Sequence, residues 1–465
     1  MTFNKLTYEI LSAIKSIVGE DALITERDGM DKYSHDETED LIYYPEIVVK
    51  PKSPQEISDL MKLCNQHRIP VTPRGAGTGL SGGALPVKGG VLLAMERFNN
   101  VINIDEDNLQ ATVEPGVITE VFMNMVAGKN LLYPVDPASK GSCFIGGNVS
   151  HGSGGPRVVK YGTIREYILN LEVVLPNGEI IWTGANTLKY ASGYNLTQLM
   201  IGSEGTLGII TKIVVKLIPR PTHDALLLAS FSNNESACAA VSAIFRAGIV
   251  PSALEFMERK GLEWVIKYDG INFELKDDIE AFLLIEVDGT NPDVIFTDCE
   301  KINTVLEQFD CKDVLFADSS AQKEELWRLR RTMAVSVRSN SIFKEEDTVV
   351  PRSKLPQLIK GIKEIGGRYN FESVCFGHAG DGNLHVNILK GNMSDYDWNN
   401  KLKDGIHEIF ELTVSLGGTL SGEHGIGLVQ KEFMPIKYSN THFELWRGIK
   451  NVFDKNGILN PGKIF

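Results

Sequence analysis

The chain has 465 residues, of which 43% are hydrophobic and 23% charged, a composition typical of a globular protein rather than a disordered one. This length exceeds one ordinary hydrophobic core, so we expect two or more domains. The formal net charge is −13 and no basic block occurs, which argues against nucleic acid and anionic membranes as main partners.

The N-terminal sequence and the hydropathy favour a cytoplasmic protein. The first residues hold no cationic region followed by an apolar core, so we expect no secretory signal. We expect no transmembrane helix, because no apolar run reaches the roughly 18 residues that such a helix needs. The six cysteines form no Cys-x-x-Cys pair, which is typical of reduced thiols and provides no ligand set for an iron–sulfur cluster.

Hydrophobic periodicity predicts a β-rich first half. Residues 5–18 follow a 3.6-residue period and predict a helix. Ser53 and Pro54 predict the N-cap and first turn of a second helix, which runs to about residue 67. The strands expected in this half are 46–50, 69–72, 91–95, 101–104, 110–114, 168–175, 179–182 and 207–218.

A proline-rich segment at 218–221 predicts a domain boundary, beyond which strands and helices alternate. This alternation predicts an α+β domain with a sheet covered on one face. The expected strands are 225–231, 282–287, 313–317 and 346–350, the expected helices are 235–247, 293–308, 321–338 and 353–365, and a hairpin around 373–388 and a helix at 397–416 follow.

Three glycine-rich loops stand out in the first half. The loop at 73–84 holds five glycines and two hydroxyl side chains, which lets backbone N–H groups converge on an anion. A Rossmann fingerprint requires Gly-x-Gly-x-x-Gly at the start of a helix. Counted from Gly75, Leu80 occupies the third glycine position, and the loop runs on into a strand, so we do not expect a Rossmann site. With the loops at 146–155 and 202–211, it predicts a long ligand such as a dinucleotide, held by backbone amides.

In order and spacing these loops resemble the FAD-binding domain of the vanillyl-alcohol oxidase/p-cresol methylhydroxylase superfamily. From Pro45 to Phe465 the chain resembles the branch of FAD-linked 2-hydroxy-acid dehydrogenases, which includes D-lactate dehydrogenase, the glycolate oxidase D subunit and D-2-hydroxyglutarate dehydrogenase. The resemblance implies an α+β fold in which residues 1–219 bind FAD non-covalently and residues 220–410 form a substrate (cap) domain with a ferredoxin-like sheet. Residues 411–465 would complete the active site.

The resemblance also implies which residues contact FAD. The first loop would hold the pyrophosphate, the second the ribityl and flavin side, and the third the adenosine half, with adenine at the backbone of Ile210. Asn460 would approach the flavin ring. The residues so assigned are Pro73, Arg74, Gly75, Ala76, Gly77, Thr78, Gly79, Ser81, Gly82, Pro137, Ser142, Gly146, Gly147, Asn148, Gly155, Glu204, Gly205, Ile210 and Asn460.

Two histidines and a carboxylate suggest a metal site. His378 and His385 flank a short glycine-rich loop, and Glu423 lies in a tight turn further along the chain. This ligand set is common for a divalent cation with open positions, whereas the alternative is a hairpin that merely carries ring nitrogens. By resemblance His378, His385 and Glu423 bind a divalent metal, with zinc expected first and manganese or iron as alternatives. His424 would be the catalytic base.

The substrate contacts follow from the same resemblance. Arg330 would bind the substrate carboxylate, a task for which a planar guanidinium is well suited. Asn387 lies two residues after His385, on the same side of a strand, and is a candidate substrate contact. Glu345 stands where the family has a lysine, and Lys344 lies one position earlier. A small monoacid is therefore expected rather than the diacid 2-hydroxyglutarate.

We therefore expect FAD-dependent, metal-assisted oxidation of a small D-2-hydroxy acid, D-lactate or glycolate, with hydride transfer to flavin N5. Electrons would pass to an electron-transfer flavoprotein, an iron–sulfur subunit or a quinone. The alternatives are a D-2-hydroxyglutarate dehydrogenase, an oxidase that uses oxygen, and a non-catalytic FAD subunit of a larger complex. Membrane association is expected only through partner subunits, and the oligomeric state stays open, a homodimer included.

Overall fold

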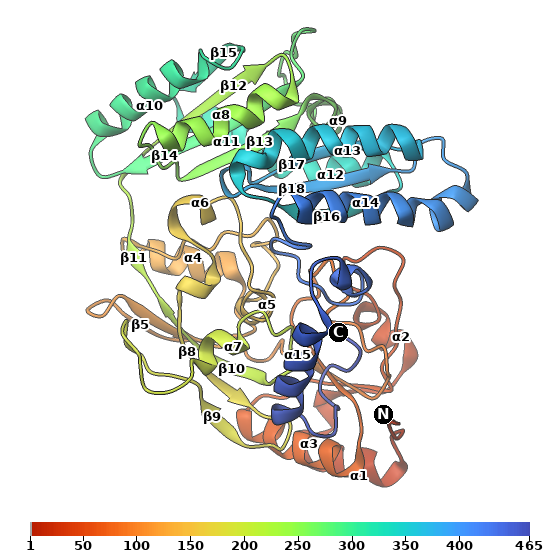
Figure 1. The fold of residues 1–465 in the computed structure, drawn as a ribbon. Helices are drawn as coiled ribbons and strands as arrows, with labels where there is room; N and C mark the ends of the chain where they lie inside the picture. The colour runs from red at the N-terminus through yellow and green to blue at the C-terminus, as the bar shows by residue number, and fades with distance from the viewer. Residues whose placement is uncertain (1) are drawn as a thin grey trace. The chain divides into compact units, whose positions relative to one another are not determined.

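The computed structural model describes residues 2–465, and the chain divides into two compact units (Figure 1). Unit 1 comprises Met1–Gly154, Thr163–Arg220 and Glu423–Phe465, and unit 2 comprises Gly155–Gly162 and Pro221–Gly422. The chain therefore leaves unit 2 and re-enters unit 1 at the peptide bond between Gly422 and Glu423. Within residues 2–465 no helix has the length and apolar content needed to cross a bilayer.

Among residues 2–465, unit 1 is built on short strands and seven α-helices. Its strands are β1 (Leu23–Ile24), β2 (Ile47–Val49), β3 (Val71–Arg74), β4 (Val91–Ala94), β5 (Val101–Asp105), β6 (Gln110–Val113), β7 (Leu131–Leu132), β8 (Ile168–Val174), β9 (Ile180–Trp182), β10 (Ile209–Lys216) and β11 (Ile218–Pro219). Its helices are α1 (Tyr8–Val18), α2 (Arg27–Met30), α3 (Pro54–His67), α4 (Thr119–Ala127), α5 (Ile145–His151), α7 (Leu196–Met200) and α15 (Asn440–Phe453).

The strands of unit 1 form two main sheets. One has the order β1-β2-β4-β3, with β2, β4 and β3 parallel, and the other is antiparallel in the order β5-β6-β10-β8-β9. α3 begins as predicted, since Ser53 Oγ accepts from the Glu56 amide and Pro54 occupies the first turn. With α1 it buries one face of the four-stranded sheet, and this core holds β3 rigidly at the start of the first glycine-rich loop.

Unit 2 contains one large antiparallel sheet. Its strands are β12 (His223–Phe231), β13 (Ala253–Glu258), β14 (Ala281–Gly289), β15 (Cys311–Ala317), β16 (Phe343–Val349), β17 (Glu372–Gly377) and β18 (Asn383–Leu389). Its helices are α6 (Val158–Tyr161), α8 (Asn234–Arg246), α9 (Arg259–Asp269), α10 (Pro292–Leu306), α11 (Ser320–Arg331), α12 (Met333–Asn340), α13 (Leu355–Tyr369) and α14 (Leu402–Ser415). The strand order is β15-β12-β14-β13-β17-β18-β16.

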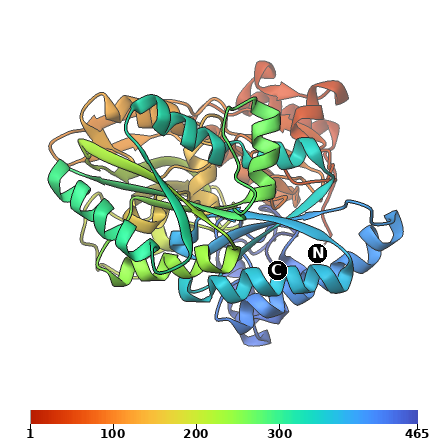
Figure 2. The ribbon, with the colours of Figure 1, turned by 90° about the horizontal axis from the view of Figure 1, so that it is seen from above.

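The expectation of a sheet covered on one face is wrong. Leu226 and Leu228 belong to a core formed with α9, α11 and α12. Leu227 points to the opposite face and is also buried, on the side where α8, α10, α13 and α14 pack. Figure 2 shows helices on both sides of this sheet. The prediction rested on the order of strands and helices along the chain and overlooked the continuous apolar runs of β12 and β14, which are typical of strands buried on both faces.

The structure also corrects single elements. The helix expected at 321–338 is two helices, α11 and α12, which meet at Thr332. The predicted hairpin at 373–388 is confirmed as the antiparallel pair of β17 and β18. Sequence reasoning missed the elements β1, β7, β13, α2, α4, α5, α6, α7, α9 and α15.

Candidate active site

The first glycine-rich loop follows β3 and closes around the side chain of Arg74. Gly77 has a φ of +80°, and a Cβ there would lie 2.0 Å from Arg74 Nη2, so glycine permits this close approach. Arg74 is buried, and its Nη2 donates to the Lys32 carbonyl at 3.1 Å. Its Nη1 is buried and has no hydrogen-bond partner among residues 2–465. A buried guanidinium nitrogen without an acceptor indicates an anionic ligand.

The second loop forms α5 and supplies open space beside the first. Gly146 packs so closely on Pro115 that an added Cβ would lie 2.3 Å from Pro115 Cβ. Gly147, in contrast, would direct a Cβ into space where, apart from its chain neighbours and the backbone of its own helix, no heavy atom of residues 2–465 lies within 4 Å. Asn148 donates to Thr119 Oγ1 at 2.7 Å and thereby fixes the helix. The loop therefore combines a fixed backbone with room for a ligand.

His151 ends α5 and lies beside both the first loop and the C-terminal turn. Cβ atoms built on Gly83 and Gly425 would each lie 3.0 Å from an atom of its ring. Its Nδ1 is buried and has no hydrogen-bond partner in the described part of the chain, and the same holds for Ser81 Oγ. Together with Arg74 Nη1, these atoms form a set of buried polar groups that a polar ligand would satisfy.

The third loop holds the turn that carries Glu423 and His424. The Glu204 carboxylate accepts from the backbone amides of Ile426 and Gly427, each at 2.8 Å. Glu204 has a φ of 51°, so its own backbone is in the left-handed region. Backbone amides donating to a carboxylate make strong bonds, so the turn is fixed within unit 1.

Two adjoining cavities in unit 1 run along these loops, since Gly75, Ala84, Gly147 and His151 line both. Glu423 and His424 line one of them. The cavities are lined by most of the predicted FAD residues, namely Pro73, Arg74, Gly75, Ala76, Gly77, Thr78, Gly79, Pro137, Gly146, Gly147, Asn148, Glu204, Gly205 and Ile210. Of the predicted set, Ser81, Gly82, Ser142, Gly155 and Asn460 line neither cavity.

Asn460 lies behind the loops rather than on a cavity wall. Its Nδ2 donates to the carbonyls of Gly83 and Glu204, and its Oδ1 accepts from Lys463. Burial lowers the pKa of Lys463 to about 8. This pair therefore ties the first and third loops to the C-terminal segment.

In unit 2 the two candidate metal histidines meet where β17 turns into β18. The ring centroids of His378 and His385 are 5.5 Å apart, and both side chains are buried. The ligand nitrogens of the two rings lie within 4.8 Å of each other. The hairpin thus brings together two imidazoles that could share a metal ion.

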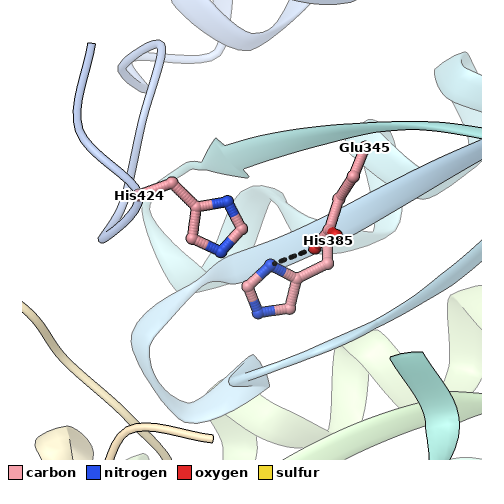
Figure 3. A group of neighbouring side chains, drawn as sticks. All are labelled: Glu345, His385 and His424. Atoms are coloured by element: carbon pink, nitrogen blue, oxygen red, sulfur yellow. Dashed lines mark ion pairs between the residues drawn. The ribbon is translucent and has the colours of Figure 1, made fainter. Parts of the chain in front are cut away.

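Each imidazole faces a carboxylate through Nδ1. His378 Nδ1 lies 2.8 and 2.9 Å from the two oxygens of Glu255 on β13. His385 Nδ1 lies 3.4 Å from Glu345 Oε1, an ion pair between neighbouring strands that Figure 3 shows. Glu255 engages Nδ1 of His378, which would direct the opposite ring nitrogen, Nε2, toward a metal ion.

Arg330 and Asn387 adjoin this cluster. Arg330 donates from Nε to Glu255 Oε2 at 2.7 Å, and its guanidinium lies 5.1 Å above the ring of Phe376. Asn387 donates to the Val374 carbonyl, whereas its Oδ1 is buried without a partner among residues 2–465. Burial alone would raise the pKa of Glu255, but the adjacent His378 and Arg330 lower it below its ordinary value.

Two family models match the chain. A model described as FAD binding domain matches residues 45–184, and one described as FAD linked oxidases, C-terminal domain, matches residues 220–464. The chain belongs to the family of FAD-linked oxidases. The resemblance inferred from the glycine loops, the expected fold and the expectation of FAD are therefore confirmed.

Curated relatives match this chain over nearly their full lengths. It is 38% identical to "Glycolate oxidase subunit GlcD" of Bacillus subtilis (strain 168), over 99% of this chain and 97% of the relative. It is 36% identical to a "D-lactate dehydrogenase" of Anaerostipes hadrus, over 99% and 98%. Identity to a "D-2-hydroxyglutarate dehydrogenase" of Stutzerimonas stutzeri (strain A1501) is 31%, over 98% of both.

Solved structures share the fold of this chain. p-Cresol methylhydroxylase with bound substrate matches with a TM-score of 0.79 at 18% identity, over 98% of this chain and 96% of that chain. The 4-ethylphenol oxidase from Gulosibacter chungangensis matches with a TM-score of 0.78 at 18% identity, over 100% and 98%.

Sequence reasoning missed Glu255. A signal was present, because the apolar run of β13 is interrupted by Glu255 and Glu258, and a buried carboxylate needs a partner. It went unused because β13 itself was not predicted. Asp347 was also missed, although its strand was predicted and it lies opposite His385 in the register of β16 and β18.

Proposed function

We propose that the protein oxidises a small D-2-hydroxy acid, D-lactate or glycolate, to the 2-oxo acid, with non-covalent FAD and a divalent metal ion. The proposal rests mainly on one observation in unit 2. The buried side chains of His378, His385 and Arg330 lie close together at one end of the sheet. Two metal-type ligands beside a carboxylate-binding cation match the chelating hydroxyl and carboxylate of a 2-hydroxy acid. Relatives named glycolate oxidase subunit and D-lactate dehydrogenase support the same substrate class.

The metal would be held by His378, His385 and Glu423, with zinc favoured by two nitrogens and one carboxylate. Chain connectivity supports the third ligand. The Gly422 amide and Ser421 Oγ each donate to Asp347 Oδ2 at 2.8 Å, next to His385 in the sheet register. Glu423 is the next residue, so the backbone of the third ligand starts one peptide bond from this anchor.

Arg330 is oriented to bind the substrate carboxylate. Glu255 engages its Nε–H, and the two Nη nitrogens are left to form a bidentate pair with a carboxylate. Asn387 Oδ1 offers a second polar contact on the same strand as His385. The cluster would fix the substrate through its carboxylate and its hydroxyl.

His424 would remove the hydroxyl proton. When bound, FAD supplies a hydride acceptor at N5 and the metal ion supplies positive charge that acidifies the hydroxyl. A ring nitrogen of His424 would then accept the proton, a contribution of typically about 10²–10⁴-fold. His424 lines the same cavity as the first two glycine loops, which supports a base beside the flavin.

Glu345 supports a monoacid substrate. Its carboxylate lies beside His385 and would repel a second carboxylate on a diacid. This feature disfavours the D-2-hydroxyglutarate dehydrogenase alternative. A non-catalytic FAD subunit would have no use for paired imidazoles beside an arginine.

Electrons would leave to an electron-transfer flavoprotein, an iron–sulfur subunit or a quinone rather than to NAD. The first glycine-rich loop leads to β4 and not to the helix that a Rossmann dinucleotide site requires. A dehydrogenase should show slow reoxidation of its reduced flavin by air and fast reoxidation by a dye. Fast reoxidation by air would instead indicate an oxidase.

A substrate panel tests the proposal. FAD-loaded protein is mixed anaerobically with both lactate enantiomers, glycolate, malate and 2-hydroxyglutarate, and the loss of flavin absorbance is followed. D-lactate or glycolate should bleach the flavin fastest. Bleaching by 2-hydroxyglutarate alone would overturn the monoacid assignment, and no bleaching by any hydroxy acid would overturn the function.

A further inference from the structure

We propose that Glu255 is a positioning residue that holds a metal-ligand histidine and the substrate-binding arginine in one arrangement. This inference rests on the proposed function. It assigns a role to a carboxylate that neither a sequence motif nor the chemistry of the reaction identifies.

The Glu255 carboxylate contacts two side chains at once, those of His378 and Arg330. The residue is 1% exposed and lies on β13, whose register with β17 continues to His378. Both of its oxygens lie within 2.9 Å of His378 Nδ1, and Oε2 also accepts from Arg330 Nε at 2.7 Å. A change in the position of this carboxylate therefore moves both partners.

The bonds between Glu255 and Arg330 differ from those of an ion pair that serves stability alone. An arginine and a carboxylate pair most strongly through two parallel N–H···O bonds. Arg330 offers only Nε to Glu255, and the histidine takes the remaining acceptor capacity. The pairing with Glu255 thus uses neither the Nη nitrogens of Arg330 nor Nε2 of His378.

A second buried carboxylate provides a matched control. Glu286 lies on the adjacent strand β14, is 3% exposed and also bonds a side chain of α11, Trp327, at 3.0 Å. Its other partners are Ser252 and Arg157, each at 2.9 Å. No contact of Glu286 with His378 or Arg330 occurs among residues 2–465. The Glu286→Gln variant therefore measures the structural effect of removing a buried charge from the same sheet.

The test compares the FAD-loaded wild type with Glu255→Gln, Glu255→Asp and Glu286→Gln. Zinc affinity is measured by competition with a chromophoric chelator, and KM and kcat are measured with the fastest hydroxy acid of the panel. Loss of a carboxylate behind a metal-ligating histidine typically lowers metal affinity about 10–100-fold. Glu255→Gln should show such a loss together with a raised KM, and Glu286→Gln should keep the wild-type zinc affinity.

Each outcome decides the inference. Wild-type zinc affinity in folded Glu255→Gln would overturn it, and so would equal losses in Glu255→Gln and Glu286→Gln. If Glu255→Gln does not fold, Glu255→Asp, which retains the charge but draws it back by one methylene, must show weakened zinc binding. A wild type that binds no zinc would overturn the metal part of the proposed function as well, which separates the two failures.

Discussion

Replacing Glu204 by glutamine should misplace the catalytic turn without removing any reacting group. The Glu204 carboxylate accepts from the Ile426 and Gly427 amides, each at 2.8 Å, and His424 precedes Ile426 by two residues. In Glu204→Gln the amide oxygen can accept from one N–H, while the NH₂ group faces the other. One bond to a charged acceptor is lost and one buried N–H is left without a partner.

The magnitude follows from these two losses. A hydrogen bond to a charged group contributes about 1.5–3 kcal/mol, and an unsatisfied buried donor costs about 1–3 kcal/mol. Because the residual bond and relaxation offset part of this, we expect a loss of about 3 kcal/mol in unfolding free energy. A displacement of about 1 Å in a catalytic group lowers the rate by about 10²-fold, and kcat should fall by that order.

Urea unfolding and steady-state kinetics at saturating FAD measure both effects. Asp454→Asn is the matched control, since Asp454 is buried in the same unit and accepts from the Ile458 and Leu459 amides at 3.1 and 2.8 Å. Because Asp454 also pairs with Lys450 Nζ at 2.6 Å, Asp454→Asn should lose at least as much stability yet retain kcat. If Glu204→Gln lost stability but kept wild-type kcat, the link between Glu204 and the position of His424 would be refuted.

Three further predictions concern charge. The pKa of Lys463 is lowered to about 8 from 10.5, so the unfolded apoprotein binds more protons above about pH 8. Apoprotein stability relative to Lys463→Gln should therefore rise by on the order of 1 kcal/mol between about pH 7 and pH 9; a flat difference in urea unfolding would contradict this. Glu345→Lys should raise the ratio of kcat/KM for 2-hydroxyglutarate over D-lactate by about tenfold, equivalent to about 1.4 kcal/mol, and an unchanged ratio would remove Glu345 from substrate selection. His424→Ala should retain FAD and zinc but turn over about 10²–10⁴-fold more slowly, whereas near-normal turnover would exclude it as the base.

Local signals predicted most strands of the first unit but few of its helices. Ser53 with Pro54 marked the start of α3, and β4, β5, β6, β8, β9 and β10 lie at or close to predicted strands, whereas β7 was missed. α5 was not predicted because Gly146 and Gly147 are poor helix formers. Packing of Gly146 on Pro115 and the Asn148–Thr119 bond support this helix, and both involve contacts distant in sequence.

The candidate site could be predicted only in part. His378 and His385 lie in a recognisable hairpin, so their proximity could be expected from the sequence. Glu255 precedes His378 by 123 residues and reaches it through the pairing of β13 with β17. Strand order within a seven-stranded sheet depends on tertiary packing, which no local pattern encodes.

The most direct test of a metal-assisted flavin dehydrogenase is the anaerobic reductive half-reaction before and after metal removal. FAD-loaded protein is stripped with a chelator, its metal content and flavin spectrum are verified, and it is mixed with D-lactate or glycolate. The account predicts that the stripped protein keeps its flavin but is not bleached, and that added zinc restores bleaching. Bleaching at an unchanged rate after verified metal removal would contradict it.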